Sequence, residues 1–169
     1  MNIVLIGYRC CGKSSVGRYI ADKTGREFID TDGLIEKKAG STIEEIISDR
    51  GWEYFRELEK GIVKEISAAD NLVIATGGGI VMDEENNLNL KRNGFVVWLK
   101  GDVEVISARM NSDEDNGDIR PSLTGKNPVD EIKDVMDIRE PFYRKAGDMA
   151  VDTSHLSIPE VAELIMKEI

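Results

Sequence analysis

The stretch G-Y-R-C-C-G-K-S at residues 7–14 constrains this chain more than any other feature, because it reads G-x-x-x-x-G-K-S between two segments of different periodicity. Residues 3–6, directly before it, are aliphatic and mostly β-branched, as in a buried parallel strand. Residues 14–23, behind it, carry apolar side chains at helical spacing. A strand, a glycine-containing loop and a helix in this order predict a site where backbone N–H groups bind the phosphates of a nucleotide.

Two residues at the end of this loop have side chains suited to phosphate chemistry. We expect Lys13 to reach the β- and γ-phosphates and the Ser14 hydroxyl to hold Mg²⁺. Cys10 and Cys11 are the only cysteines, and because adjacent cysteines seldom form a stabilising disulfide, they indicate a reduced, cytoplasmic protein. We interpret both as small residues in tolerant loop positions, with a redox-sensitive loop as the alternative.

Composition narrows the classes of partner. The length of 169 residues suits one domain with a hydrophobic core. The net charge of −10 and the lack of a basic tract argue against a nucleic-acid partner. No apolar run approaches the ~20 residues of a membrane span, and no signal peptide precedes the first strand, so we expect a cytoplasmic protein without a membrane partner. Because a nucleotide is a polyanion, its site must be built from a few local cations.

Apolar patterning along the chain alternates between strand and helix. The expected strands are residues 3–6, 27–30, 72–75, 95–99 and 149–152. The expected helices are residues 14–23, 34–69 with a break at Gly51, 83–92, 102–110, 128–145 with an interruption or bend near Pro141, and one that follows residue 157. This alternation predicts βαβ units with right-handed crossovers, and therefore one α/β domain with a parallel sheet.

Local signals mark helix starts and one long loop. Residues 41–44 (S-T-I-E) and 157–160 (S-I-P-E) fit the capping-box pattern. Residues 111–127 are polar, acidic and without apolar periodicity, which predicts a mobile surface loop.

Polar residues follow the second and third expected strands at the edge where a parallel sheet binds its ligands. Asp30 could fix Mg²⁺, and Asp32 could orient or deprotonate an acceptor hydroxyl; the alternative is that Asp32 and the glycine after it cap the next helix. Gly77-Gly78-Gly79 follows the third strand and offers exposed backbone that a ligand can approach, although a flexible turn is the alternative. We expect these residues to converge on the phosphate loop.

Three arginines are the candidate local cations. Arg120 lies in the predicted mobile loop, where it could close onto a transferring phosphate. Arg56 and Arg139 offer the fork-shaped donors that bidentate binding of a carboxylate requires. Taken alone, Arg56 suits an exposed ion pair with a glutamate of its own helix better than a binding site.

Six segments of the chain match the motifs of one family in that family's order. They are the loop ending in Gly12-Lys13-Ser14, Phe28-Ile29-Asp30-Thr31-Asp32, Phe55-Arg56-Glu57-Leu58-Glu59, Thr76-Gly77-Gly78-Gly79, Arg120-Pro121-Ser122-Leu123 and Arg139-Glu140-Pro141-Phe142-Tyr143. The chain thus resembles the shikimate kinases, small P-loop kinases of the nucleoside-monophosphate-kinase fold. The resemblance implies a three-layer α/β fold, a five-stranded parallel sheet of order 2-3-1-4-5 and helices on both faces. Within this single domain, residues 33–61 would be the substrate-binding subdomain and residues 111–125 the mobile lid.

The resemblance also implies an activity and a set of site residues. The activity is ATP-dependent phosphorylation of the 3-hydroxyl of shikimate, a step of aromatic amino-acid (chorismate) biosynthesis, with Mg²⁺ and in what we expect to be a monomer. The catalytic residues would be Lys13, Asp32 and Arg120. The nucleotide-binding residues would be Cys10, Cys11, Gly12, Lys13, Ser14, Ser15, Arg109 and Arg120. The shikimate-binding residues would be Asp32, Arg56, Gly77, Gly78, Gly79 and Arg139, and the metal residues Ser14 and Asp30.

The chain departs from the family pattern in two places near the nucleotide. Cys10 and Cys11 replace the more usual glycine and small residue, so the backbone would approach the phosphates more tightly. His155 stands where relatives often have a basic residue, in the stretch 152–159 that would form one side of the adenine site, opposite Arg109.

Other functions fit parts of the sequence. A P-loop kinase for gluconate or a nucleoside monophosphate would share the loop and lid, but the triple glycine with Arg56 and Arg139 favours a small carboxylated polyol. A GTP-dependent switch is suggested by D-T-D-G at residues 30–33, yet no N-K-x-D tetrapeptide exists to read guanine. An inactive nucleotide-binding module is disfavoured because Lys13, Asp32 and Arg120 are intact.

Overall fold

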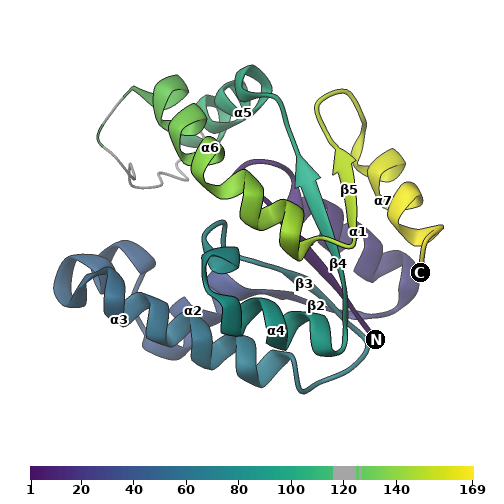
Figure 1. Ribbon diagram of the computed structural model, residues 1–169, viewed down its shortest axis with the longest axis horizontal. Helices are drawn as coiled ribbons and strands as arrows, with labels where there is room; N and C mark the ends of the chain where they lie inside the picture. The colour runs from purple at the N-terminus through teal and green to yellow at the C-terminus, as the bar shows by residue number, and fades with distance from the viewer. Residues whose placement is uncertain (116–124, 126) are drawn as a thin grey trace.

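A computed structural model describes residues 1–115, 125 and 127–169 (Figure 1). In this part of the chain one parallel sheet has the order β2-β3-β1-β4-β5. Its strands are β1 (Asn2–Ile6), β2 (Glu27–Asp30), β3 (Leu72–Ala75), β4 (Gly94–Lys100) and β5 (Met149–Asp152). The sheet order implied by the family resemblance is therefore confirmed, and each expected strand forms.

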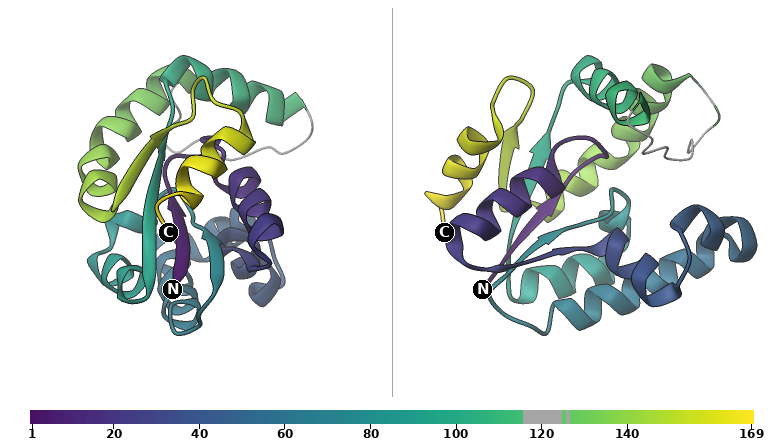
Figure 2. Two further views of the ribbon diagram at one scale, coloured as in Figure 1. Left: turned by 90° about the vertical axis from the view of Figure 1, so that its right-hand side faces the viewer. Right: turned by 180° about the vertical axis from the view of Figure 1, so that it is seen from behind.

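Helices cover both faces of the sheet. They are α1 (Lys13–Thr24), α2 (Thr31–Ala39), α3 (Ile43–Ile66), α4 (Glu84–Arg92), α5 (Val103–Asp115), α6 (Pro128–Ala146) and α7 (Ile158–Met166), with a short 3₁₀ turn at Ile80–Met82. Figure 1 shows α4 and α6 in front of the sheet, and the rear view in Figure 2 shows α1 and α7 behind it. The three expected layers are therefore present.

Strand β1 illustrates how the sequence divides between the two faces. Val4 and Ile6 belong to the buried cluster that α3, α4 and α6 complete, whereas Ile3 and Leu5 belong to the cluster completed by α1 and α7. Side chains alternate between the faces of a strand, and here both faces are buried. A continuous aliphatic run, rather than an alternating one, is the pattern that such a strand requires.

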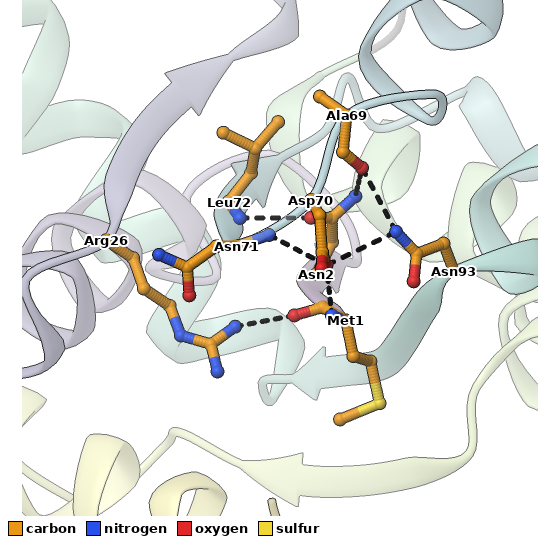
Figure 3. A network of polar contacts seen from close by, with 8 residues as sticks. All are labelled: Met1, Asn2, Arg26, Ala69, Asp70, Asn71, Leu72 and Asn93. Atoms are coloured by element: carbon orange, nitrogen blue, oxygen red, sulfur yellow. Dashed lines mark hydrogen bonds and ion pairs between the residues drawn. The ribbon is translucent and has the colours of Figure 1, made fainter.

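A polar network anchors the amino ends of the strands (Figure 3). The buried Asn2 side chain donates to Ala69 O (3.0 Å) and accepts from the backbone N–H of Leu72 (3.0 Å). Asn93 also donates to Ala69 O (3.1 Å), and Arg26 donates to Met1 O (2.7 Å). These bonds tie the first two residues of the chain to the segments that precede β2, β3 and β4, at the end of the strands opposite the glycine loop.

The expected helix over residues 34–69 is instead two helices. Gly40, with φ 71°, ends α2 in the left-handed conformation that glycine favours. The capping box lies one residue later than expected: Thr42 Oγ1 accepts from Glu45 N (3.2 Å), and Thr42 N donates to the Glu45 carboxylate (2.8 Å). Two adjacent hydroxyl residues and two adjacent glutamates fit the pattern in both registers, so spacing alone could not separate them.

One further helix boundary differs from expectation. Helix α5 continues to Asp115, so residues 111–115 are helical and do not belong to a loop. Polar residues can continue a helix on the surface, where backbone hydrogen bonds suffice and apolar periodicity is not needed; Asn111 and Ser112 are exposed. Helix α6 runs through Pro141 without interruption. Of the helices in the described ranges, none is long and apolar enough to cross a membrane.

Candidate active site

The glycine loop joins β1 to α1, and two of its glycines are required for different reasons. A Cβ on Gly7 would lie 2.4 Å from Leu99 O, at the end of the neighbouring strand β4. Gly12 is the N-cap of α1 with φ 96°, which L side chains rarely adopt. Cys10 also has a left-handed φ of 59° although it is not glycine. The loop is thus held tightly against the sheet edge, with the N-terminus of α1 beneath it.

Lys13 lies inside this loop. Its side chain is buried, and Nζ donates to Gly7 O (2.9 Å) and Tyr8 O (2.7 Å). Cys11 Sγ is 3.7 Å from the same nitrogen, and Cys11 is fully buried in the cluster under α1 and α7. Cys11 therefore fills a packed position, contrary to our interpretation of both cysteines as residues in tolerant positions, because the loop closes over it. The ammonium group is a local cation within an acidic chain.

Ser14 and Asp30 meet as expected for a metal site. Ser14 Oγ donates to Asp30 Oδ2 (2.7 Å), and Asp30 Oδ1 accepts from the backbone N–H of Asp32 (3.1 Å). Asp30 is therefore the N-cap of α2, and Asp32 lies in its first turn; the alternative that placed the cap at Asp32 is wrong. A hydroxyl and a carboxylate are the hard oxygen donors that Mg²⁺ prefers, so this pair fits the ion that the family resemblance implies.

The three glycines after β3 make room for the side chains around them. A Cβ on Gly77 would lie 2.7 Å from Asp32 Oδ1, and one on Gly79 would lie 2.4 Å from Arg56 Nη2. At Gly78 the distance to Arg139 Nη1 would be 3.5 Å, an ordinary contact. None of the three has a positive φ, so close packing, not turn geometry, explains glycine at positions 77 and 79, whereas a Cβ would fit at position 78. Asp32, Arg56 and Arg139 thus converge on the triple glycine, as predicted from sequence.

Arg56 is held by its own helix. Its Nη1 donates to Glu59 Oε2 at 2.7 Å, the i,i+3 pair that the sequence suggested as an exposed alternative. Glu59 is only 1 % exposed, however, so the pair is not a surface feature. Burial raises the pKa of Glu59, and nearby Asp32 acts in the same direction, while Arg56 opposes the rise. Glu59 was not predicted as a site residue, although its spacing of three residues from Arg56 was an available signal.

Helix α6 contributes two further residues to which the sequence assigned no role. Tyr143, one turn after Arg139, donates through its hydroxyl to Gly78 O, and burial raises its pKa. Glu131, at the start of α6, is buried and pairs with the largely buried Arg9 of the glycine loop. These contacts join residues far apart in sequence, and no local pattern marks them.

The expected adenine-side residues also lie together. Arg109 donates to Thr153 O (2.7 Å), to Thr153 Oγ1 (3.2 Å) and to Cys10 O (3.4 Å), so it links the glycine loop to the segment after β5. His155 of that segment is exposed, with Nε2 3.9 Å from Asp102 Oδ2. Arg120 and most of the expected lid lie outside the described residues.

A cleft of about 910 Å³ is lined by residues of the glycine loop, α1, α2, α3, the triple glycine and α6. Most of the predicted site residues line it: Cys10, Gly12, Lys13, Ser14, Ser15, Asp30, Asp32, Arg56, Gly77, Gly78, Gly79 and Arg139. Cys11 and Arg109 do not line it. A cation on the phosphate loop thus faces, across one cleft, two arginines and an aspartate beside the triple glycine. This arrangement suits transfer of a phosphoryl group to a small anionic acceptor.

Comparison with known proteins identifies the family of the chain. A profile of the shikimate kinase family matches residues 9–169. A shikimate kinase of Caldanaerobacter subterraneus subsp. tengcongensis is 43% identical over 166 residues, covering 98% of this chain and 94% of the relative. One of Symbiobacterium thermophilum is 40% identical over 169 residues, covering 100% and 96%.

Solved structures give the same result. A shikimate kinase from Acinetobacter baumannii in complex with shikimate superimposes with a TM-score of 0.91 and 36% identity, covering 99% of this chain and 91% of that one. The enzyme from Aquifex aeolicus gives a TM-score of 0.81 and 33% identity, covering 99% and 95%. With the profile matching nearly the whole chain and relatives this similar over their full length, the chain belongs to the shikimate kinase family.

Proposed function

We propose that this chain transfers the γ-phosphoryl group of ATP to the 3-hydroxyl of shikimate, giving ADP and shikimate 3-phosphate. The observation that carries the proposal is the convergence of Asp32, Arg56 and Arg139 on the triple glycine, across one cleft from Lys13. Shikimate is a small ring with one carboxylate and three hydroxyls. Two arginines match its carboxylate, and an aspartate matches its hydroxyls.

The proposed mechanism is an in-line displacement. The acceptor oxygen forms a bond to the γ-phosphorus while the bond from phosphorus to the β,γ-bridging oxygen breaks, and the hydroxyl proton passes to Asp32. Lys13 stabilises the negative charge on the transferred group. Ser14 and Asp30 would hold Mg²⁺, which supplies charge neutralisation at the phosphates when bound. Arg120, in the expected lid, would add a second cation.

Cellular setting and assembly belong to the same proposal. We expect a cytoplasmic monomer in which residues 33–61 bind the acceptor and residues 111–125 form the lid. Cys11 is a free thiol, which suits a reducing compartment. Size-exclusion chromatography with light scattering tests the monomer, and an obligate dimer would contradict it.

A substrate panel tests the acceptor. ADP release should be measured with shikimate, gluconate and a nucleoside monophosphate, each with ATP and with GTP. We expect turnover with shikimate and ATP. Turnover of gluconate without turnover of shikimate would refute the proposed acceptor, and a requirement for GTP would refute the proposed donor.

Replacing Arg139 tests the binding of the carboxylate. Arg139→Ala should raise the KM for shikimate and leave the KM for ATP unchanged, since removing one partner of a desolvated charge pair costs about 2–5 kcal/mol. Arg144→Ala is the matched control, because Arg144 lies on the same helix but is exposed and pairs with Glu140. An unchanged KM for shikimate in Arg139→Ala would remove Arg139 from this role.

A further inference from the structure

Trp52 is a large aromatic residue of the cleft to which neither the sequence analysis nor the proposed mechanism assigned a role. It lines the cleft on α3, and its residue exposure is 44 %. It directly follows Gly51, whose φ of 83° and ψ of 169° break the helix there. This backbone conformation is essentially restricted to glycine. Gly51 therefore determines where the second part of α3 begins and where Trp52 is placed.

The Trp52 ring lies over the guanidinium of Arg56, one helical turn later. The Arg56 Cζ atom is 5.5 Å from the Trp52 ring centroid and 5.2 Å from that of Phe55. The two rings meet edge to face with centroids 6.0 Å apart. Phe55 is buried, so Trp52 is the outer member of the pair and the one that meets solvent.

These contacts leave N–H donors of the Arg56 guanidinium available to a substrate carboxylate. Glu59 accepts from Nη1, and the space beside Gly79 is filled by the guanidinium. An aromatic ring attracts the face of a guanidinium and does not use its in-plane N–H donors. Trp52 can therefore restrain Arg56 without competing with a carboxylate for its hydrogen bonds, which a further acidic neighbour would do.

We propose that Trp52 is a positioning residue for acceptor binding, which holds the Arg56 guanidinium ready for the carboxylate of the substrate. This inference rests on the proposed function, in which Arg56 binds that carboxylate. A long arginine side chain that is already restrained loses less conformational freedom when the substrate binds. Trp52 therefore acts on acceptor affinity and not on the transfer step.

The kinetic test compares Trp52→Leu with Trp52→Phe and with Tyr54→Leu. Tyr54 is a matched control, since it lies on the same helix with 38 % exposure but faces Arg50, 4.4 Å from its ring centroid, and does not line the cleft. Trp52→Leu should raise the KM for shikimate about fivefold, with kcat and the KM for ATP within about twofold. Trp52→Phe should retain most of the affinity because it keeps an aromatic face, and Tyr54→Leu should match the wild type.

A double-mutant cycle separates positioning from direct contact with the substrate. In an Arg56→Ala background, Trp52→Leu should cause no further rise in KM, because Trp52 would act only through Arg56. Fully additive effects would overturn the proposal and indicate that the ring touches the substrate itself. An unchanged KM in Trp52→Leu, or an equal rise in Tyr54→Leu, would also overturn it.

A spectroscopic measurement makes the test independent of the acceptor's identity. The Arg56 Nε–H resonance of the protein without substrate, assigned with Arg56→Lys, should show a ring-current shift from Trp52 and Phe55. Trp52→Leu should reduce this shift and Tyr54→Leu should keep it; a shift that Trp52→Leu leaves unchanged would overturn the positioning role even if shikimate is turned over. Failure of the wild type to turn over shikimate would refute the proposed function, while the resonance still reports whether Trp52 holds Arg56.

Discussion

Replacing Gly79 with alanine should disable acceptor binding while sparing the fold. Gly79 has φ −99° and ψ −1°, a conformation open to any residue, so alanine adds no backbone strain. Its Cβ, however, would lie 2.4 Å from Arg56 Nη2, 2.9 Å from Nη1 and 3.0 Å from Cζ. Non-bonded heavy atoms are best separated by about 3.5 Å, so the guanidinium must retreat by roughly 1 Å.

The two consequences of this retreat differ in size. The Arg56 guanidinium is the far end of a long side chain that is 32 % exposed, so the shift should weaken its bond to Glu59 without breaking it and cost about 1 kcal/mol of folding stability. A hydrogen bond to a charged group contributes about 1.5–3 kcal/mol, and losing one to the acceptor carboxylate corresponds to a roughly 10- to 150-fold higher KM. The Arg56 side chain can move aside, but its hydrogen bonds to the acceptor carboxylate depend on direction and are lost when it moves.

Steady-state kinetics with shikimate varied at saturating ATP, together with urea denaturation, measure both quantities. Gly61→Ala is the control, because a methyl group added to Gly61, in α3, would have no described atom within 4 Å beyond its chain neighbours and its own helix backbone. That variant should keep its KM and gain up to about 1 kcal/mol from the lower entropy of the unfolded chain. A Gly79→Ala enzyme with a KM within twofold of the wild type would refute the argument, as would a loss of several kcal/mol in stability.

Three other variants test separate parts of the structure. Lys13→Ala should lower kcat by roughly 10²–10³ through loss of charge stabilisation, and near-normal turnover would remove Lys13 from catalysis. Gly51→Ala should cost about 1–3 kcal/mol in urea denaturation because of its φ and ψ, and an unchanged midpoint would contradict that account. Burial raises the pKa of Glu59 above 4.5, so the folded state retains this proton to higher pH than the unfolded state. The unfolding free energy of the wild type should therefore decrease relative to Glu59→Gln as pH rises from 4.5 through the folded pKa; a constant difference would exclude the shift.

Several parts of the fold were predictable because their causes are local. The aliphatic run of β1, the glycine loop and the capping pattern before α7 each depend on residues a few positions apart. Local patterns failed where two registers were equivalent, as at Thr42, or where a surface helix needed no apolar stripe, as in α5. The sheet order was available only through resemblance, because strand periodicity does not say which strands are neighbours.

The sequence by itself determined the chemistry at the sheet edge: which residues stand after each strand, and that Lys13, Asp32 and Arg139 are of the right types. The tertiary structure alone decided what surrounds them. It buries Glu59 beside Arg56, sets Trp52 over the same guanidinium and joins Arg9 to Glu131 across 122 positions of sequence. Periodicity and motifs give information about the segment in which a residue lies, whereas its burial and its pairing depend on which distant segments pack against it. For that reason the triple glycine could be recognised in the sequence, but the close contacts that require glycine at positions 77 and 79 could be identified only in the folded chain.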